Sequence, residues 1–287
     1  MYKEKFVRYI NKYPRLKKIA KVVLKFLNDD VPGLTAELTF YLITSFFPFA
    51  ILLLSLISIT PLSAEDTIYQ LFSALPQDVY DIIFNFLTGI TISPPIVIFS
   101  TLLAMWSLSG AVSTISKALN RMYGAKETRN QFIIRSIGAL FAFLLALTIV
   151  LAFSTLILGN IIGMLISRFF PSFNVLWHFL RIVFMFFVMF CVFASLYKIL
   201  PDKKLRFKNV FIGAISTTLL WSGASIVFSF YIDNFSKHHI IYGSIAGVLV
   251  LVTWLYMSSF IILSGGEINA LIHHKKHLTK SNDINKV

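Results

Sequence analysis

The sequence predicts an all-α, polytopic integral membrane protein with six transmembrane helices and short amphipathic helices on both membrane faces. Three observations predict this fold class. The 287 residues are 57% hydrophobic and only 14% charged, whereas soluble domains are roughly a quarter charged. Six stretches are apolar over the roughly 20 residues that a helix needs to cross a bilayer. Basic residues also concentrate in alternate connecting segments, as in multi-pass membrane proteins.

The six predicted spans divide the chain into three parts. These parts are a basic amphipathic segment 1–33, a six-helix transmembrane domain 34–270 and a basic tail 271–287. The third span is longer than a bilayer requires, so it is expected to tilt or to project past the lipid. In chain order, the spans cover residues 34–60, 94–116, 135–165, 175–199, 208–231 and 240–266.

The distribution of lysine and arginine predicts the orientation. Nine of these residues lie in 1–33, whereas the loop 61–93 has none and is acidic. Five more lie in 117–135, five in 198–208 and four in 268–287, all on the same predicted side as the N-terminus. The positive-inside rule therefore places both termini in the cytoplasm. The exceptions are Arg168, Arg181 and Lys237.

Two segments outside the spans have amphipathic helical patterns. Residues 1–28, interrupted by Pro14, have apolar residues at helical spacing with lysines opposite, and are expected to lie on the cytoplasmic surface. They are either an ordinary basic flank or a specific contact for anionic headgroups. The loop 61–93 predicts two short helices separated by Pro76, which either form a lid or lie on the outer surface.

Charged residues in or beside the spans are candidates for function because they are costly in lipid, at roughly 2.5–3.5 kcal/mol each near the bilayer centre. Glu37 and Glu267 are expected near the cytoplasmic ends of the first and last spans, and Arg181 about two turns into the fourth from its outer end. None of the carboxylates is expected at the bilayer centre. This pattern disfavours an ion-coupled antiporter, whose site usually lies near the midplane.

The sequence contains no nuclease, hydrolase or nucleotide-binding motif, so we expect neither an enzyme nor a bound cofactor. Its single cysteine excludes an internal disulfide or a cysteine metal cluster. His273 and His277 are four residues apart, but we interpret them as part of a solvated basic tail rather than as metal ligands. The net charge of +13 is attributed to the membrane face, and no nucleic-acid partner is expected.

Four segments carry a resemblance to a known family. They are AELTFYLITSFFPFAILLL (36–54), MWSLSGAVSTISKALNRMYG (105–124), YKILPDKKLRFKNVFIGA (197–214) and FYIDNFSKHHIIYGSIAGVLVLVTWLYMSSFIILSGGEINA (230–270). In this order they resemble the YihY/BrkB family, bacterial inner-membrane proteins once labelled ribonuclease BN. The resemblance implies a place in the bacterial inner membrane and a role in the envelope rather than in RNA cleavage.

The candidate site combines residues of this resemblance with the charges discussed above. Glu37 departs from the family pattern and is included only for its charge. The candidate substrate, headgroup or structural polar cluster comprises Asn120, Arg121, Tyr123, Glu267, Asn269, Glu37 and Tyr242. The resemblance implies structural roles for Ser45, Pro48, Gly124, Pro201, Gly243, Trp254 and Gly266.

The residues SGGEINA (264–270) lead to two specific expectations. Gly265 and Gly266 predict close packing of the last span against another helix. If the second and last spans are neighbours, Glu267 is predicted to form an ion pair with Arg121, in a structural or headgroup-gating role.

The leading functional interpretation is a transporter or flippase-like protein for lipid or another amphiphilic envelope component. Membrane lipids, especially those with anionic headgroups, would be its partners. One alternative is a cation/proton antiporter that uses Glu37 and Glu267. Another is a non-transporting scaffold that binds envelope-assembly proteins, and self-association into a homo-oligomer is a further expectation.

Overall fold

The computed structural model describes residues 14–58, 93–141, 143–144, 147–148, 173–235 and 243–284, and all its regular elements there are helices. Five of these helices are long and apolar enough to cross a membrane, and a shorter apolar helix covers Gln131–Phe141. The prediction of an all-α, multi-pass membrane protein is confirmed. The longer elements are α2 (Pro14–Asn28), α3 (Val31–Ser58), α6 (Pro94–Tyr123), α8 (Phe173–Ile199), α9 (Phe207–Phe235) and α10 (Gly243–Ile284).

Five predicted spans correspond to α3, α6, α8, α9 and α10, and two of these helices continue beyond the predicted spans. Helix α6 continues to Tyr123 rather than ending at 116, and Gly124 then ends it with a left-handed φ of 61°. Helix α10 continues through most of the predicted tail to Ile284. The third span is described only in part, and the predicted outer helices of 61–93 lie outside the described residues, except for Ser93.

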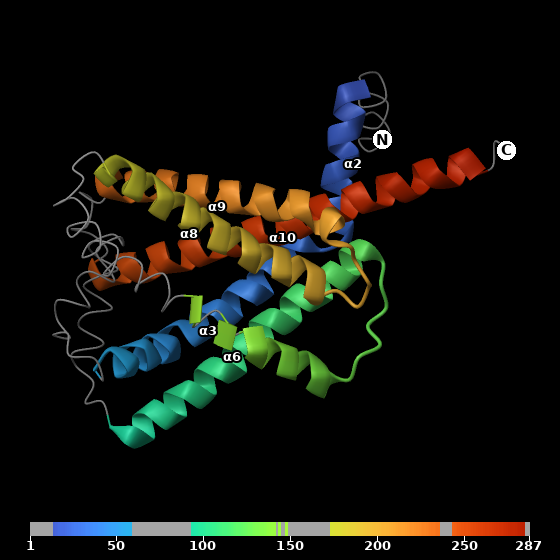
Figure 1. The fold of residues 1–287 in the computed structure, drawn as a ribbon. Coiled ribbons are helices and arrows are strands. Elements are labelled where there is room, and N and C mark those ends of the chain that lie inside the picture. Colours follow the sequence, from blue (N-terminus) through green and yellow to red (C-terminus); the bar gives the residue numbers. More distant parts are fainter. Residues whose placement is uncertain are drawn as a thin grey trace.

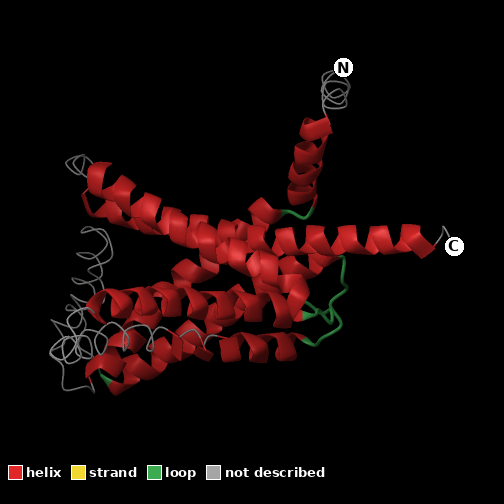
Figure 2. Cartoon of the chain, turned by 45° about the horizontal axis from the view of Figure 1, so that its top comes forward, coloured by secondary structure: helices red, strands yellow, loops and turns green. Residues whose placement is uncertain are grey.

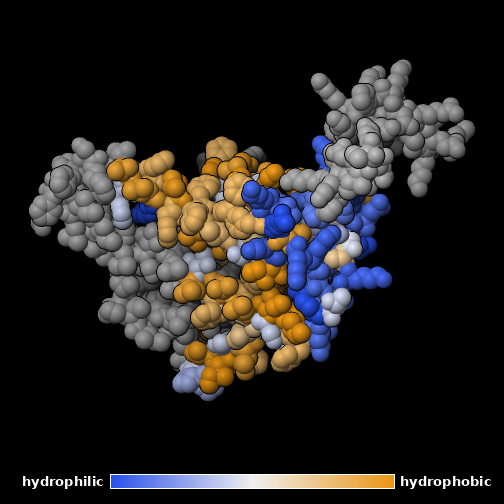
Figure 3. Space-filling view, turned by 45° about the vertical axis from the view of Figure 1, so that its right-hand side comes forward, coloured by the Kyte–Doolittle hydropathy of each residue, from blue (hydrophilic) through white to orange (hydrophobic). Residues whose placement is uncertain are grey.

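Helix α10 lies at the centre of the described bundle (Figure 1). It contacts α3, α6 and α9, while α3 packs most extensively on α6, and α8 packs on α9. Apolar residues cover the visible side of the bundle, and hydrophilic residues gather at one end (Figure 3). This distribution fits helices that face lipid along their length and water at that end.

We call this end the basic end of the bundle. It carries α2, the loops 124–130 and 200–206, and the C-terminal part of α10 (Figure 1). The segments predicted to share one side of the membrane therefore do lie together. That they face the cytoplasm stays a prediction from the positive-inside rule.

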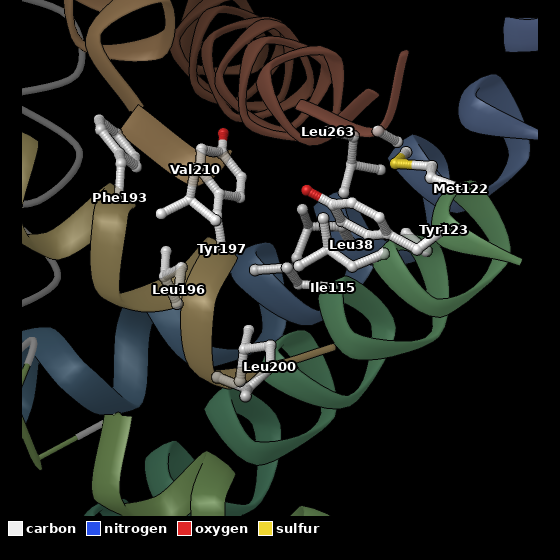
Figure 4. Close-up of a cluster of buried hydrophobic side chains, with 14 of the residues drawn as sticks. Leu38, Ile115, Met122, Tyr123, Phe193, Leu196, Tyr197, Leu200, Val210 and Leu263 are labelled. Carbon is white, nitrogen blue, oxygen red and sulfur yellow. The ribbon is translucent and has the colours of Figure 1, made fainter. Parts of the chain in front are cut away.

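Among the described residues, a buried hydrophobic cluster lies toward the basic end. Figure 4 shows Tyr123 of α6 beside Leu38 of α3 and Leu263 of α10, with Tyr197 of α8 beside Val210 of α9. All five are at most 3% exposed. Because lipid is as apolar as these side chains, close van der Waals packing rather than exclusion of water holds such helices together.

Candidate functional site

Two glycines allow α10 to pack between its neighbours, as predicted. A side chain at Gly265 would collide with Thr217 of α9 and would approach the Tyr197 hydroxyl of α8 to 2.5 Å. A side chain at Gly266 would approach Leu119 of α6 to 2.5 Å. Consecutive residues point about 100° apart on a helix, so each glycine admits a different neighbour. The residue that follows them, Glu267, is thereby held inside the bundle.

Glu267 is fully buried, and its partner is a lysine from α2. Lys25 Nζ lies 3.0 Å from Glu267 Oε1, and it also contacts the Asp29 carboxylate and donates a 3.3 Å hydrogen bond to the Met122 carbonyl. The ion pair departs from hydrogen-bond geometry, and no described residue donates a hydrogen bond to either oxygen of Glu267. We call Lys25, Asp29, Glu267 and the Met122 carbonyl the Glu267 cluster.

The two carboxylates of the Glu267 cluster raise the pKa of Lys25. Burial lowers the pKa of the Lys25 ammonium, but Asp29 and Glu267 outweigh that effect, so its pKa lies above the ordinary value of 10.5. Lysine therefore stays charged at neutral pH and shares its single positive charge between two carboxylates.

The predicted ion pair between Arg121 and Glu267 was wrong. Arg121 Nη1 lies 3.3 Å from Asp30 Oδ2, and both side chains are about half exposed. Helices α6 and α10 are neighbours, as the prediction required. However, Leu119 and Met122 occupy the buried face of α6, which leaves Arg121 on its outward face.

Glu37 is separate from the Glu267 cluster. Its carboxylate accepts a 3.0 Å hydrogen bond from Thr114 Oγ1 and forms a 3.0 Å ion pair with Lys117. Both partners lie on α6, and the pair is substantially exposed. Glu37 therefore links α3 to α6 at the surface, and it does not share partners with Glu267.

Asn269 joins α10 to the start of α9. Its Oδ1 accepts a 2.7 Å hydrogen bond from the Gly213 amide, and its Nδ2 donates a 3.1 Å bond to the Val210 carbonyl. The side chain is fully buried. A primary amide has the donor and the acceptor needed to bond two backbone groups at once, so Asn269 has a structural role here.

Asn120 joins two loops of the basic end. Its Nδ2 donates a 2.6 Å hydrogen bond to Glu127 Oε2, and its Oδ1 accepts a 2.6 Å bond from the Asp202 amide. Asp202 in turn accepts bonds of 2.7 and 2.6 Å from the amide and hydroxyl of Thr128. We call Ser116, Asn120, Glu127, Thr128, Arg129, Asp202 and the Leu200 carbonyl the Asn120 clasp.

Arg129 completes the Asn120 clasp. It forms a 2.8 Å ion pair with Glu127 and donates a 2.7 Å hydrogen bond to the Leu200 carbonyl and a 3.1 Å bond to Ser116. Its hydrogen bond and charge lower the pKa of Glu127, and Glu127 raises the pKa of Arg129. Hydrogen bonds from Thr128 lower the pKa of Asp202. The clasp is therefore fully ionised at neutral pH.

Tyr123 lies beside the Glu267 cluster. It is 1% exposed, its ring meets the His273 ring edge-on at 5.6 Å between centroids, and no described residue hydrogen-bonds its hydroxyl. His274 Nε2 lies 3.1 Å from the Met122 carbonyl oxygen that also contacts Lys25. Within the described ranges, no group of three or more His, Cys, Asp or Glu residues is arranged to bind a metal.

The residues expected to be structural have varied surroundings. Ser45 donates a 3.0 Å bond to the Leu42 carbonyl, one turn before the buried Pro48. Trp254 packs on Trp221 and Phe228, with ring centroids 5.4 and 5.2 Å apart. Pro201 is buried in the loop after α8, and Gly243 begins α10. Tyr242 lies outside the described residues.

An apolar groove of about 360 Å³ runs along the bundle between α3, α6, α8 and the segment that begins at Gln131. It extends along α8 from Phe184 to Leu196 and reaches α10 only at Ile262. Cys191, the single cysteine of the chain, also lines it. Sequence analysis missed the groove because the apolar residues that line it are of the same types as residues that face lipid.

Sequence analysis also missed the lysine of the Glu267 cluster and a buried contact of Tyr197. Lys25 was one of nine basic residues in 1–33, and no local pattern distinguishes it from the others. Tyr197 donates a 2.6 Å hydrogen bond to the Ile262 carbonyl and lies 2.7 Å from Thr217 Oγ1. A tyrosine and a threonine within apolar spans are the signal that could have indicated this contact.

Comparison with known proteins identifies the family. The family model of virulence factor BrkB matches residues 22–286. The chain is 34% identical over 254 residues to the putative ribonuclease-like protein YfkH of Bacillus subtilis strain 168, covering 86% of this chain and 92% of that protein. No solved structure matches the chain.

Shorter matches connect the chain to UPF0761 membrane proteins. One from Vibrio cholerae serotype O1 is 30% identical over 95 residues, covering 33% of this chain and 32% of that protein. One from Aliivibrio salmonicida is 37% identical over 81 residues, covering 28% and 26%. Because the family match spans nearly the whole chain and the fold is helical and multi-pass, the protein belongs to the virulence factor BrkB family of membrane proteins.

Proposed function

We propose that the protein moves a lipid or another amphiphilic envelope component across the bacterial inner membrane. The observation that carries this proposal is the apolar groove, because its length and lining suit an acyl chain. From Phe184 to Leu196, α8 rises about 18 Å at 1.5 Å per residue. One leaflet of hydrocarbon is about 15 Å thick, half of a 30 Å bilayer core.

The groove ends beside polar groups of the basic end. Ile115 and Leu196 line the groove, and the residues that follow them, Ser116 and Tyr197, belong to polar contacts of that end. A lipid whose chain occupied the groove would place its headgroup toward the Asn120 clasp. Arg121 lies outside the clasp, beside Asp30, and its half-exposed guanidinium is a candidate headgroup contact at the same end, whereas Glu267 is enclosed and has a mainly structural role.

The single cysteine allows a direct test of the groove. Purified protein in proteoliposomes should move fluorescent phosphatidylglycerol or a polyprenyl phosphate faster than protein-free vesicles. Attaching a bulky maleimide to Cys191 should abolish the movement by filling the groove. As a matched control, the same label goes on Leu219→Cys in a Cys191→Ser background, since Leu219 is 60% exposed on α9 and lies outside the groove lining.

Two results would refute the proposal. One is movement no faster than in protein-free vesicles for every lipid tried. The other is movement that the Cys191 label leaves unchanged, because the groove would then play no part in it.

A cation/proton antiporter is the second candidate, favoured by the buried Glu267 and its oxygens that accept no hydrogen bond from described residues. Glu37 has its own partner on α6, so this candidate depends on Glu267 alone. Glu267→Gln should then abolish salt-dependent proton flux in inverted vesicles. Unchanged flux in a folded Glu267→Gln protein would reject it.

A further inference from the structure

Helix α2 runs roughly perpendicular to the spans at the basic end, and it projects beyond the side of the bundle from its C-terminal end. Figures 1 and 2 both show this orientation. The chain turns from α2 into α3 at Asp30, which has a φ of 57°, a left-handed conformation that aspartate tolerates better than most residues. With the spans crossing the bilayer, a helix perpendicular to them at the end of the bundle would lie parallel to the membrane plane.

Helix α2 has an apolar arc formed by Phe26 and four aliphatic side chains, and the bundle leaves much of this arc exposed. Phe26 packs on Phe260 of α10, with ring centroids 6.4 Å apart, and Phe260 is itself 40% exposed on the apolar side of its helix. The arc of α2 thus continues the surface that the spans present to lipid. Its other members are 40–59% exposed: Val22, Val23, Leu24 and Leu27.

The sequence places positive charge on the opposite arc of α2. At 100° per residue, the sequence pattern predicts Lys17, Lys18 and Lys21 on the side away from Val23. The two acidic residues after the helix, Asp29 and Asp30, are paired with Lys25 and Arg121. An apolar arc combined with a lysine arc is the pattern of helices that bind anionic membrane surfaces.

We propose that α2 is an interfacial helix that binds anionic lipid headgroups, with its apolar arc inserted among the acyl chains. The ion pair between Lys25 and Glu267 fixes one end of this helix to the bundle, so that the arc is held at the membrane surface. This binding concerns the membrane surface alone and does not depend on the proposed transport through the groove.

The test compares two positions on α2 in the full-length protein. Val23→Cys and Asn28→Cys are made separately in a Cys191→Ser background and labelled with the fluorophore NBD. Asn28 is exposed at the end of the helix, on the arc opposite Val23. The proteins are reconstituted in phosphatidylcholine alone or with about one third phosphatidylglycerol, a common way to supply anionic headgroups. Quenching by spin-labelled lipid and by aqueous iodide is then measured.

We expect spin-labelled lipid to quench the Val23 label and iodide to quench the Asn28 label, with the contrast several-fold larger in the anionic vesicles. Adding Lys25→Gln should reduce lipid quenching at Val23 in neutral vesicles, and phosphatidylglycerol should restore it. Equal quenching at the two positions in both vesicles would overturn the insertion of the arc. A contrast that phosphatidylglycerol leaves unchanged would overturn the binding of anionic headgroups.

Discussion

Removing the lysine of the Glu267 cluster should destabilise the protein strongly. In Lys25→Ala, the carboxylate of Glu267 would remain fully buried without its cation. Breaking a buried ion pair from one side typically costs about 3–5 kcal/mol. Lys25 is 25% exposed, so water partly screens the pair, and we expect the lower end of that range, about 3 kcal/mol.

Thermal unfolding in detergent micelles measures this loss. About 3 kcal/mol corresponds to a Tm lowered by roughly 6–12 °C for a protein of this size. The double variant Lys25→Met/Glu267→Gln removes both charges and should recover most of the loss. The matched control is Lys117→Ala, which breaks the exposed pair with Glu37 and should cost less than about 1 kcal/mol.

The energetic coupling between the two residues decides this prediction. If Lys25→Ala and Lys117→Ala lowered the Tm equally, the buried pair would be no more important than a surface pair. If Glu267→Gln destabilised the Lys25→Ala protein further instead of rescuing it, the two side chains would act independently. Either result would refute the assignment of Lys25 as the partner of Glu267.

Three further predictions concern the packing and the polar contacts of the basic end. Gly265→Ala should destabilise the protein by about 1–3 kcal/mol through collision with α8 and α9, whereas Gly223→Ala, with open space around it, should have little effect on the Tm. Asn269→Ala should cost about 2–4 kcal/mol, because two buried hydrogen bonds between α10 and α9 are lost. Since Arg129 lowers the pKa of Glu127, the stability from this pair is present above the ordinary value of 4.5 and is lost as the pH falls through the lower folded-state value. The protection of the loop 124–130 from hydrogen exchange, corrected for the intrinsic exchange rate at each pH, should therefore fall in acid and stay constant around neutral pH.

The sequence was sufficient to predict the class of fold and most of its spans. Apolar length alone located α8 (Phe173–Ile199) and α9 (Phe207–Phe235) to within a few residues. Helices α6 and α10 continue past the predicted spans for a physical reason. Hydropathy measures where a helix leaves the lipid, but the helix ends only where its backbone is capped, as at Gly124.

The packing role of Gly265 and Gly266 was also predictable, because a residue without a side chain in a membrane helix permits a close neighbour whatever that neighbour is. The partner of Glu267 was not. Several basic residues lie near the same end, and the choice between Arg121 and Lys25 depends on the rotation of α6 and on the turn that brings the last turn of α2 against the bundle. Both are tertiary features that no local pattern specifies.

The position of α2 also changes the meaning of the carboxylate. By its place near the end of a span, Glu267 belongs to the rim of the bundle, where contact with headgroups and water would make a charge inexpensive. It is nevertheless fully buried, because the last turn of α2 lies against that end and supplies Lys25 in place of solvent. A variant that detached α2 would expose Glu267 to the membrane surface and remove its cation in one step. The attachment of α2 and the ionisation of Glu267 are therefore linked, and any change in lipid charge that shifts α2 should change the environment of that carboxylate.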